Sequence, residues 1–208
     1  MSLPFPSKIV CVGQNYAAHA AELGHEVPVE PLIFLKPPSA VIRTGEDIVM
    51  PIWAGRVDFE GEIGVVIGAR ARNVAADAAW EHVAGFAPVN DVTARELQMS
   101  DGQWSRAKGF DTFCPIGLVI PLEEVDLDGL RVMTRVNGEV RQDSPVQDMV
   151  FKIPVLIEHI TRFMTLEPGD VIATGTPSGI GPLADGDEVV VEIAGVGEVR
   201  NRVREEEA

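Results

Sequence analysis

The sequence is short of cysteine and of long apolar runs. Its two cysteines, Cys11 and Cys114, sit in apolar segments, as buried thiols do. Two cysteines supply neither a disulfide framework nor a zinc signature. No apolar run approaches the ~20 residues of a membrane span, and the first residues lack a signal-peptide pattern. We therefore expect a cytoplasmic protein with no membrane partner.

Basic residues are also scarce. Lysine and arginine together number 17 against 32 aspartates and glutamates, and the formal net charge is −15. A nucleic acid would need a basic face, so it is not expected as a partner. An acidic protein that binds an acidic substrate needs a local positive charge, and a bound divalent cation would supply it.

Linker-like stretches, repeats and low-complexity blocks are missing, and glycine and proline are spread along all 208 residues. This distribution favours one domain, and a chain of this length can bury a sizeable core. We expect a single catalytic domain over residues 1–208, in which the N-terminal segment 1–7 and the acidic tail 204–208 are peripheral.

Apolar periodicity and turn residues predict a strand-rich chain. Helices are expected at residues 15–23 and 153–164, with a shorter one at 76–83. Asn137-Gly138 is a strong hairpin signal. Strands are expected at residues 8–12, 32–35, 59–67, 83–89, 130–136, 139–142, 170–173, 188–193 and 197–203. Without regular strand–helix–strand alternation, the pattern predicts a β-rich α+β fold built on a contorted sheet.

Three carboxylates carry the strongest chemical pattern. Glu60 and Glu62 are two residues apart on an expected strand, so both point to one face. Two glutamates on a strand that enters the core repel each other and are costly to desolvate, which a divalent cation would offset. Gly61 between them leaves the opposite face open to close approach. Asp91 ends another apolar strand and can supply a third oxygen.

Oxygen ligands with no Cys or His nearby select a hard ion, Mg²⁺ or Mn²⁺. The alternative is that these are solvated acids on an acidic protein, because the Glu-x-Glu pattern is common.

A histidine and a glutamate lie one helical turn apart. His19 and Glu22 are at i and i+3, so they share a helix face. A carboxylate bonded to one imidazole nitrogen fixes the tautomer and leaves the other nitrogen able to take a proton from water. The alternative is an incidental pair on a surface helix.

Two further segments carry weaker signals. Arg106 and Lys108 are basic residues among aromatics that could bind a carboxylate or a developing enolate, or could be a solvated surface pair. The glycine-rich segment 174–181 could cradle an anion. It lacks the Lys-Ser/Thr ending of a nucleotide P-loop, so ATP binding is rejected.

Several motifs in order resemble the fumarylacetoacetate hydrolase family, in particular its catalytic-domain-only members, from about residue 8 to residue 203. They are Val12-Gly13-Gln14-Asn15-Tyr16-Ala17-Ala18-His19, Phe34-Leu35-Lys36-Pro37, Asp58-Phe59-Glu60-Gly61-Glu62, Val89-Asn90-Asp91-Val92-Thr93-Ala94-Arg95, Lys108-Gly109-Phe110-Asp111-Thr112-Phe113 and Pro168-Gly169-Asp170-Val171-Ile172-Ala173-Thr174-Gly175-Thr176-Pro177.

The resemblance implies a contorted mixed β-sheet roll, usually homodimeric, of the kind found in the C-terminal domain of these enzymes. It implies Mg²⁺ or Mn²⁺ on Glu60, Glu62 and Asp91, and a water-activating pair, His19 and Glu22, on a mobile lid. It also implies substrate contacts from Lys108, Gln98 and Thr176. Two segments depart from the pattern: Gln14 stands where many such proteins carry Arg or Leu, and Gln142-Asp143-Ser144-Pro145 replaces their usual turn.

Three functions remain open at this point. The first is a C–C hydrolase of acylpyruvate-type 2,4-dioxo acids that works through a pyruvate enolate, with decarboxylation of oxaloacetate as an additional activity of the same enolate chemistry. The second is an isomerase or decarboxylase of unsaturated 2-oxo diacids in aromatic catabolism, such as 2-hydroxyhepta-2,4-diene-1,7-dioate. The third is a non-catalytic metal- or carboxylate-binding protein. In the first two, the substrate is a small 2-oxo acid.

Overall fold

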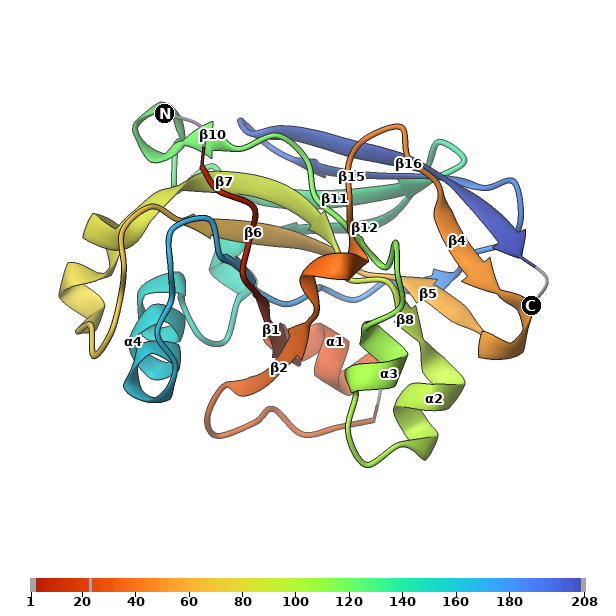
Figure 1. Ribbon diagram of the computed structural model, residues 1–208, viewed down its shortest axis with the longest axis horizontal. Coiled ribbons are helices and arrows are strands. Elements are labelled where there is room, and N and C mark those ends of the chain that lie inside the picture. The colour runs from red at the N-terminus through yellow and green to blue at the C-terminus, as the bar shows by residue number, and fades with distance from the viewer. Residues whose placement is uncertain (1–2, 23, 207–208) are drawn as a thin grey trace.

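The computed structural model describes residues 3–22 and 24–206, and strands dominate it (Figure 1). The α-helices are α1 (Ala17–Glu22), α2 (Arg95–Ser100), α3 (Ser105–Lys108) and α4 (Ile153–Phe163). The 3₁₀ helices are η1 (Pro38–Ala40), η2 (Ile52–Ala54), η3 (Ala76–His82), η4 (Leu122–Glu124) and η5 (Val146–Asp148). The strands are β1 (Ile9–Gly13), β2 (Leu32–Lys36), β3 (Val41–Ile42), β4 (Ile48–Pro51), β5 (Val57–Phe59), β6 (Gly61–Ile67), β7 (Val83–Asn90), β8 (Thr93–Ala94), β9 (Cys114–Pro115), β10 (Ile120–Pro121), β11 (Arg131–Val136), β12 (Glu139–Pro145), β13 (Val171–Ala173), β14 (Gly181–Pro182), β15 (Glu188–Ile193) and β16 (Gly197–Glu206).

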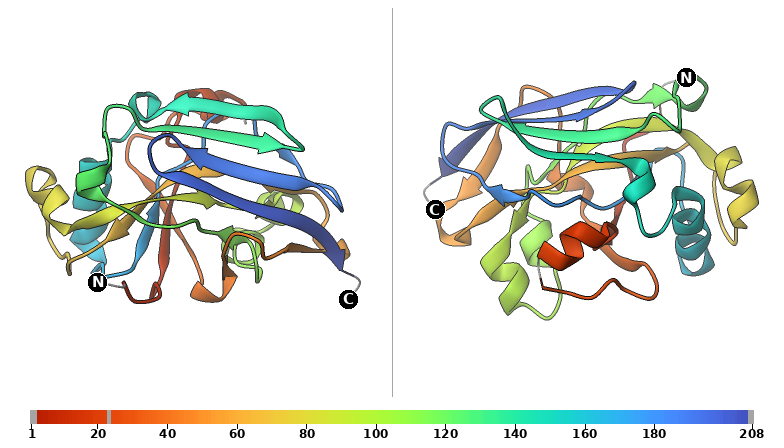
Figure 2. Two further views of the ribbon diagram at one scale, coloured as in Figure 1. Left: turned by 90° about the horizontal axis from the view of Figure 1, so that it is seen from above. Right: turned by 180° about the vertical axis from the view of Figure 1, so that it is seen from behind.

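Two mixed sheets form the framework. The larger has the order β10-β7-β6-β13-β1-β2, and the second has the order β12-β11-β15-β16-β4. Within them, β1 pairs with β13 and β16 with β4 in parallel, while the other pairs are antiparallel. The second sheet packs against β6 and β7 of the first sheet (Figure 2). The prediction of a strand-rich α+β fold with a contorted mixed sheet is confirmed.

The main core lies between these sheets and α4. Val65 of β6, Val132 of β11 and Val191 of β15 belong to one buried cluster. Four apolar residues of α4 join it, at the spacing expected of an amphipathic helix: Ile153, Leu156, Ile157 and Ile160. The helix predicted at residues 153–164 is therefore confirmed.

The β11–β12 hairpin turns at Asn137-Gly138, as predicted. Both residues have positive φ, 51° and 81°, the combination that a two-residue type I′ turn requires. The Asn137 amide donates to Asp187 and accepts from the backbone N–H of Glu188, which ties the turn to the start of β15.

Several element predictions need correction. The strand expected at residues 59–67 is interrupted at Glu60, between β5 and β6. The short helix expected at residues 76–83 is the 3₁₀ helix η3, and helices α2 and α3 were not predicted. The helix expected at residues 15–23 is α1, and position 23 lies outside the described residues.

The two ends of the described chain are more ordered than expected. Residues 204–206 were predicted to be a peripheral tail, but they continue β16 and pair with β4. Residues 207 and 208 lie outside the described part. Near the other end, Leu3 packs on a buried cluster and Ser7 donates to Asp170. In the described residues, no helix has the length and apolar character needed to cross a membrane.

Candidate active site and metal centre

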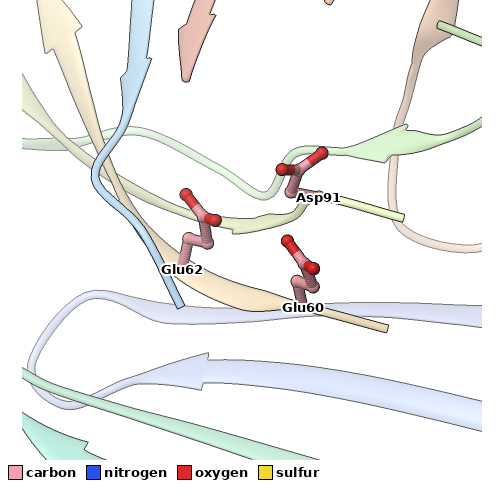
Figure 3. A group of neighbouring side chains, drawn as sticks. All are labelled: Glu60, Glu62 and Asp91. Carbon is pink, nitrogen blue, oxygen red and sulfur yellow. The ribbon is translucent and has the colours of Figure 1, made fainter. Parts of the chain in front are cut away.

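Three carboxylates meet at the start of β6 and the end of β7. Glu62 lies in β6, Glu60 directly precedes this strand, and Asp91 directly follows β7. Because β6 and β7 pair antiparallel with Gly61 opposite Asn90, the three side chains share one site. One oxygen from each lies within 4.8 Å of the other two, and all three residues are buried. Figure 3 shows the carboxylates pointing into a common space. We call these residues the carboxylate triad.

The glycine inside this motif lets the second sheet approach. A Cβ atom on Gly61 would lie 2.0 Å from Thr134 Oγ1 of β11, so any side chain there would clash. The backbone N–H of Gly61 donates to Gln142 Oε1 of β12 at 2.9 Å. The expectation that Gly61 permits close approach is confirmed, and the segment that approaches is the β11–β12 hairpin.

Buried cations surround the triad. Lys108 Nζ donates to Glu60 Oε2 at 2.8 Å and to Asp91 Oδ2 at 2.6 Å. Lys36 Nζ donates to the other oxygen of Asp91 at 2.7 Å. Arg95 donates to Glu60 and to Asp58. Glu60 and Asp91 are thereby paired with protein cations.

Glu62 is the exception. Its Oε2 accepts the backbone N–H of Gly175 at 2.8 Å, and it forms no ion pair among residues 3–22 and 24–206. Burial, together with the charges of Asp91 and Glu60, raises the pKa of Glu62 well above its usual range. A buried carboxylate with only one donor is costly to ionise.

The pKa of Glu60 moves the other way. Burial alone would raise it, but the nearby charges of Lys108 and Arg95 hold it below its usual range. The triad therefore combines ionised oxygens with one carboxylate that lacks a positive partner. This set of hard oxygen donors fits a divalent cation such as Mg²⁺ or Mn²⁺.

A cavity of about 390 Å³ contains the triad. Its volume suits a small molecule. Besides Glu60, Glu62 and Asp91 it is lined by Val12, Gly13, Gln14, His19, His25, Phe34, Arg95, Gln98, Met99, Trp104, Lys108 and Thr176.

The predicted histidine–glutamate pair is formed beside this cavity. His19 of α1 is buried, and its Nδ1 lies 3.3 Å from Glu22 Oε2. The Glu22 carboxylate also accepts the backbone N–H of Gly179, so it fastens α1 to the glycine-rich segment 174–181. With Nδ1 held by the carboxylate, His19 keeps Nε2 for proton transfer.

Some of the residues expected to contact substrate line the cavity in the structure, and one lies outside it. Lys108, Gln98 and Thr176 line the cavity, whereas Arg106 does not. Arg106 lies on the surface and pairs with Asp101, which matches the alternative of a solvated residue. The hydroxyl of Thr176 is engaged with Gly61 and Gln142.

Sequence reasoning assigned no role to three residues that shape the site. Lys36 and Arg95 pair with the acids, and Gln142 bonds Gly61, Thr176 and Pro177. For Lys36, a signal was present, because a lysine that directly ends an apolar strand is unusual. Arg95 and Gln142 bond residues that are distant in the sequence, so no local pattern marks them.

Known proteins are similar to this chain over nearly its whole length. The model of the fumarylacetoacetate (FAA) hydrolase C-terminal family matches residues 8–204. A mitochondrial oxaloacetate tautomerase of Arabidopsis thaliana is 47% identical, over 93% of this chain and 89% of that protein.

Solved structures with the same fold are also similar to this chain. The 2-hydroxyhepta-2,4-diene-1,7-dioate isomerase of Mycobacterium marinum has a TM-score of 0.89 at 43% identity, covering 97% of this chain and 76% of that one. The fumarylpyruvate hydrolase of Pseudomonas aeruginosa, solved in complex with Mn²⁺ and pyruvate, has a TM-score of 0.93 at 34% identity, covering 99% and 92%.

The fold and site thus define a class of enzymes in which a contorted mixed sheet carries a buried carboxylate triad. The chain belongs to the fumarylacetoacetate hydrolase family.

Proposed function

We propose that this protein is a Mg²⁺- or Mn²⁺-dependent enzyme that hydrolyses a C–C bond in acylpyruvate-type 2,4-dioxo acids. The observation that carries the proposal is the carboxylate triad, with its oxygens within 4.8 Å of one another, in the same cavity as His19. The expected residue roles are metal binding by Glu60, Glu62 and Asp91, and catalysis by His19, Glu22 and Lys108.

A divalent cation bound to the triad would polarise the 2-oxo group and lower the energy of the enolate. The protein's own residues supply the proton transfers. His19, oriented by Glu22, takes a proton from water at Nε2. The water oxygen adds to C4, and the C3–C4 bond breaks with its electron pair passing to C3. The proton held by His19 then returns to C3, leaving pyruvate and a carboxylic acid.

Other side chains position the substrate in this proposal. Lys108 places positive charge beside the carboxylate and enolate oxygens. Gln98 Oε1 accepts a hydrogen bond from Arg95, so its amide nitrogen is free to donate to substrate. Arg106, outside the cavity lining, is not proposed to contact it. A cytoplasmic location, a homodimer and one catalytic domain over residues 1–208 stay predictions.

A second candidate is a proton shift on a 2-oxo diacid. The tautomerase and the isomerase named above share more residues with this chain than the fumarylpyruvate hydrolase does. Enolate formation is common to both candidates and needs no attacking water. Decarboxylation of oxaloacetate would use the same enolate.

The test is a Mg²⁺-supplemented assay of acylpyruvates, oxaloacetate and 2-hydroxyhepta-2,4-diene-1,7-dioate. Hydrolysis releases pyruvate and a carboxylic acid in equal amounts, and isomerisation releases neither. His19→Ala is expected to lower kcat for acylpyruvates about 10²- to 10⁴-fold, the usual contribution of a general base. His159→Ala on α4, outside the cavity lining, is the matched control. Acylpyruvate hydrolysis by His19→Ala at the wild-type rate would remove the proposed role of the histidine.

Metal dependence is tested in the same assay. Turnover should stop with EDTA and return with Mg²⁺. Turnover that is insensitive to EDTA would contradict the metal-dependent part of the proposal, and a chain that binds these acids without converting any of them would be a binding protein.

A further inference from the structure

The residues that line the cavity are more buried at its base than at its mouth. The carboxylate triad and His19 are almost fully buried, whereas Gln14 is partly buried and His25 is exposed. All of them line the same cavity. A substrate whose 2-oxo acid end is at the triad would therefore have its other end near Gln14 and His25.

Gln14 is held in an unusual backbone conformation. Its φ is +56°, in the left-handed region that residues other than glycine rarely adopt. Such a conformation is strained and persists at places where the surrounding structure enforces it, which include ligand sites. Here it directly follows β1 and accompanies a side-chain contact with His25, beyond the end of α1.

The contact between the side chains of Gln14 and His25 determines which of their nitrogen atoms can still donate a hydrogen bond. Gln14 Nε2 lies 2.6 Å from His25 Nδ1. In this orientation of the Gln14 amide its nitrogen donates, so Nδ1 is the acceptor and the matching tautomer of His25 carries its proton on Nε2. The second N–H of the Gln14 amide and the N–H of His25 are then both donors without negative charge.

The composition of the lining decides what these donors attract. The only carboxylates among the lining residues are the three of the triad, so no acid of the lining competes at the mouth. Phe34, Met99 and Trp104 supply an apolar surface for a short carbon chain. A terminal carboxylate is the acceptor that two N–H donors bind most strongly.

We propose that Gln14 and His25 form a specificity pair that selects 2-oxo acids ending in a second carboxylate. This inference rests on the proposed function, because it takes the 2-oxo acid end to lie at the triad. It narrows the substrate class from acylpyruvates in general to dioxo diacids of the fumarylpyruvate type.

The test compares two substrates of equal length, fumarylpyruvate and crotonylpyruvate, which differ in a terminal carboxylate against a methyl group. Wild-type protein with Mg²⁺ should prefer the diacid in kcat/KM. In His25→Ala and in Gln14→Leu the preference ratio should fall about tenfold, as expected for the loss of one hydrogen bond to a charged group. His159→Ala should keep the wild-type ratio.

Binding to the Mg²⁺-loaded protein, measured by titration calorimetry, separates this inference from the proposed function. If neither compound is hydrolysed but the diacid binds more tightly and loses that advantage in His25→Ala, hydrolysis fails and the specificity pair stands. Equal affinity for the two compounds, absence of measurable binding, or an unchanged ratio in both variants would overturn the inference.

Discussion

Arg95 joins three polar groups of the site through one guanidinium. It donates to Asp58, to Glu60 and to the amide oxygen of Gln98, and it is largely buried. Burial alone would lower its pKa, but the charges and hydrogen bonds of Glu60 and Asp58 raise it above the usual range. Arg95 thus stays charged and offsets the charge of two buried acids, Asp58 and Glu60.

Arg95→Met should therefore destabilise the protein strongly. Asp58 would keep Arg56 as a partner, but among residues 3–22 and 24–206 Glu60 would keep only Lys108 as a cationic partner. Removing one member of a buried ion pair costs about 3–5 kcal/mol, to be measured as the free energy of urea unfolding. Arg106→Met is the matched control, because its exposed pair with Asp101 contributes little. Equal losses of unfolding free energy in Arg95→Met and Arg106→Met would show that burial does not strengthen the ion pairs of Arg95.

Cys114 is a thiol whose reactivity is suppressed mainly by burial. Burial raises the pKa of its thiol from 9.0 to about 12. In the native protein the thiol should not react with a thiol reagent at pH 8, and it should react once urea unfolds the chain. Rapid reaction of the native protein would contradict the buried position.

The raised pKa of the Cys114 thiol also makes the free energy of unfolding depend on pH. Between pH 9 and pH 12 the native thiol keeps a proton that the unfolded thiol has released. The free energy of unfolding therefore falls as pH rises through this window, by at most about 1.4 kcal/mol per pH unit from this group. Below pH 9 the contribution is constant. The difference between wild type and Cys114→Ala, measured at several pH values, isolates it.

At the scale of elements, β12 contributes more to the site than its sequence indicates. Gln142 accepts the N–H of Gly61 and donates to Thr176 Oγ1 and Pro177 O. It thereby connects the strand that carries Glu62 to the glycine-rich segment that receives Glu22. Gln142 is a positioning residue, since it bonds the backbone between two of the carboxylates.

Gln142→Leu should weaken divalent-cation binding about tenfold or more, the usual effect of removing a group that orients ligands. The measurement is the dissociation constant of Mn²⁺ from calorimetry. Gln147→Leu is the control, because Gln147 is exposed and, within the described part of the chain, its amide bonds only Asp128 O. An unchanged Mn²⁺ affinity in Gln142→Leu would show that Gln142 does not orient the ligands.

Some secondary-structure elements could be predicted from the sequence, and others could not. Amphipathic α4, the Asn137-Gly138 turn and the strands of the core were predictable because each follows from a local period or a turn preference. Helices α2 and α3 were not, since they are only one or two turns long and gain their stability from tertiary contacts. Spacing marked Glu60 and Glu62 but left solvated acids as an alternative, and the family resemblance implied the set of three acids. Their pairing with Lys36 and Arg95 depends on segments far apart in the sequence.

At the scale of the whole molecule, charge is distributed unevenly. The net charge is −15, yet three buried cations, Lys36, Arg95 and Lys108, gather around the carboxylate triad. The protein's own cations leave Glu62 without an ion pair among the described residues. In the proposed function, a divalent cation would place positive charge beside Glu62, where the acidic substrate is expected to bind.

The most direct test of this account is a calorimetric titration of Mn²⁺ into the metal-free protein, with Glu62→Gln and the surface variant Glu139→Gln beside it. The account predicts one tight site per chain in wild type and Glu139→Gln, weakened at least 100-fold in Glu62→Gln. Wild-type affinity in Glu62→Gln, or no tight site in the wild type, would contradict it.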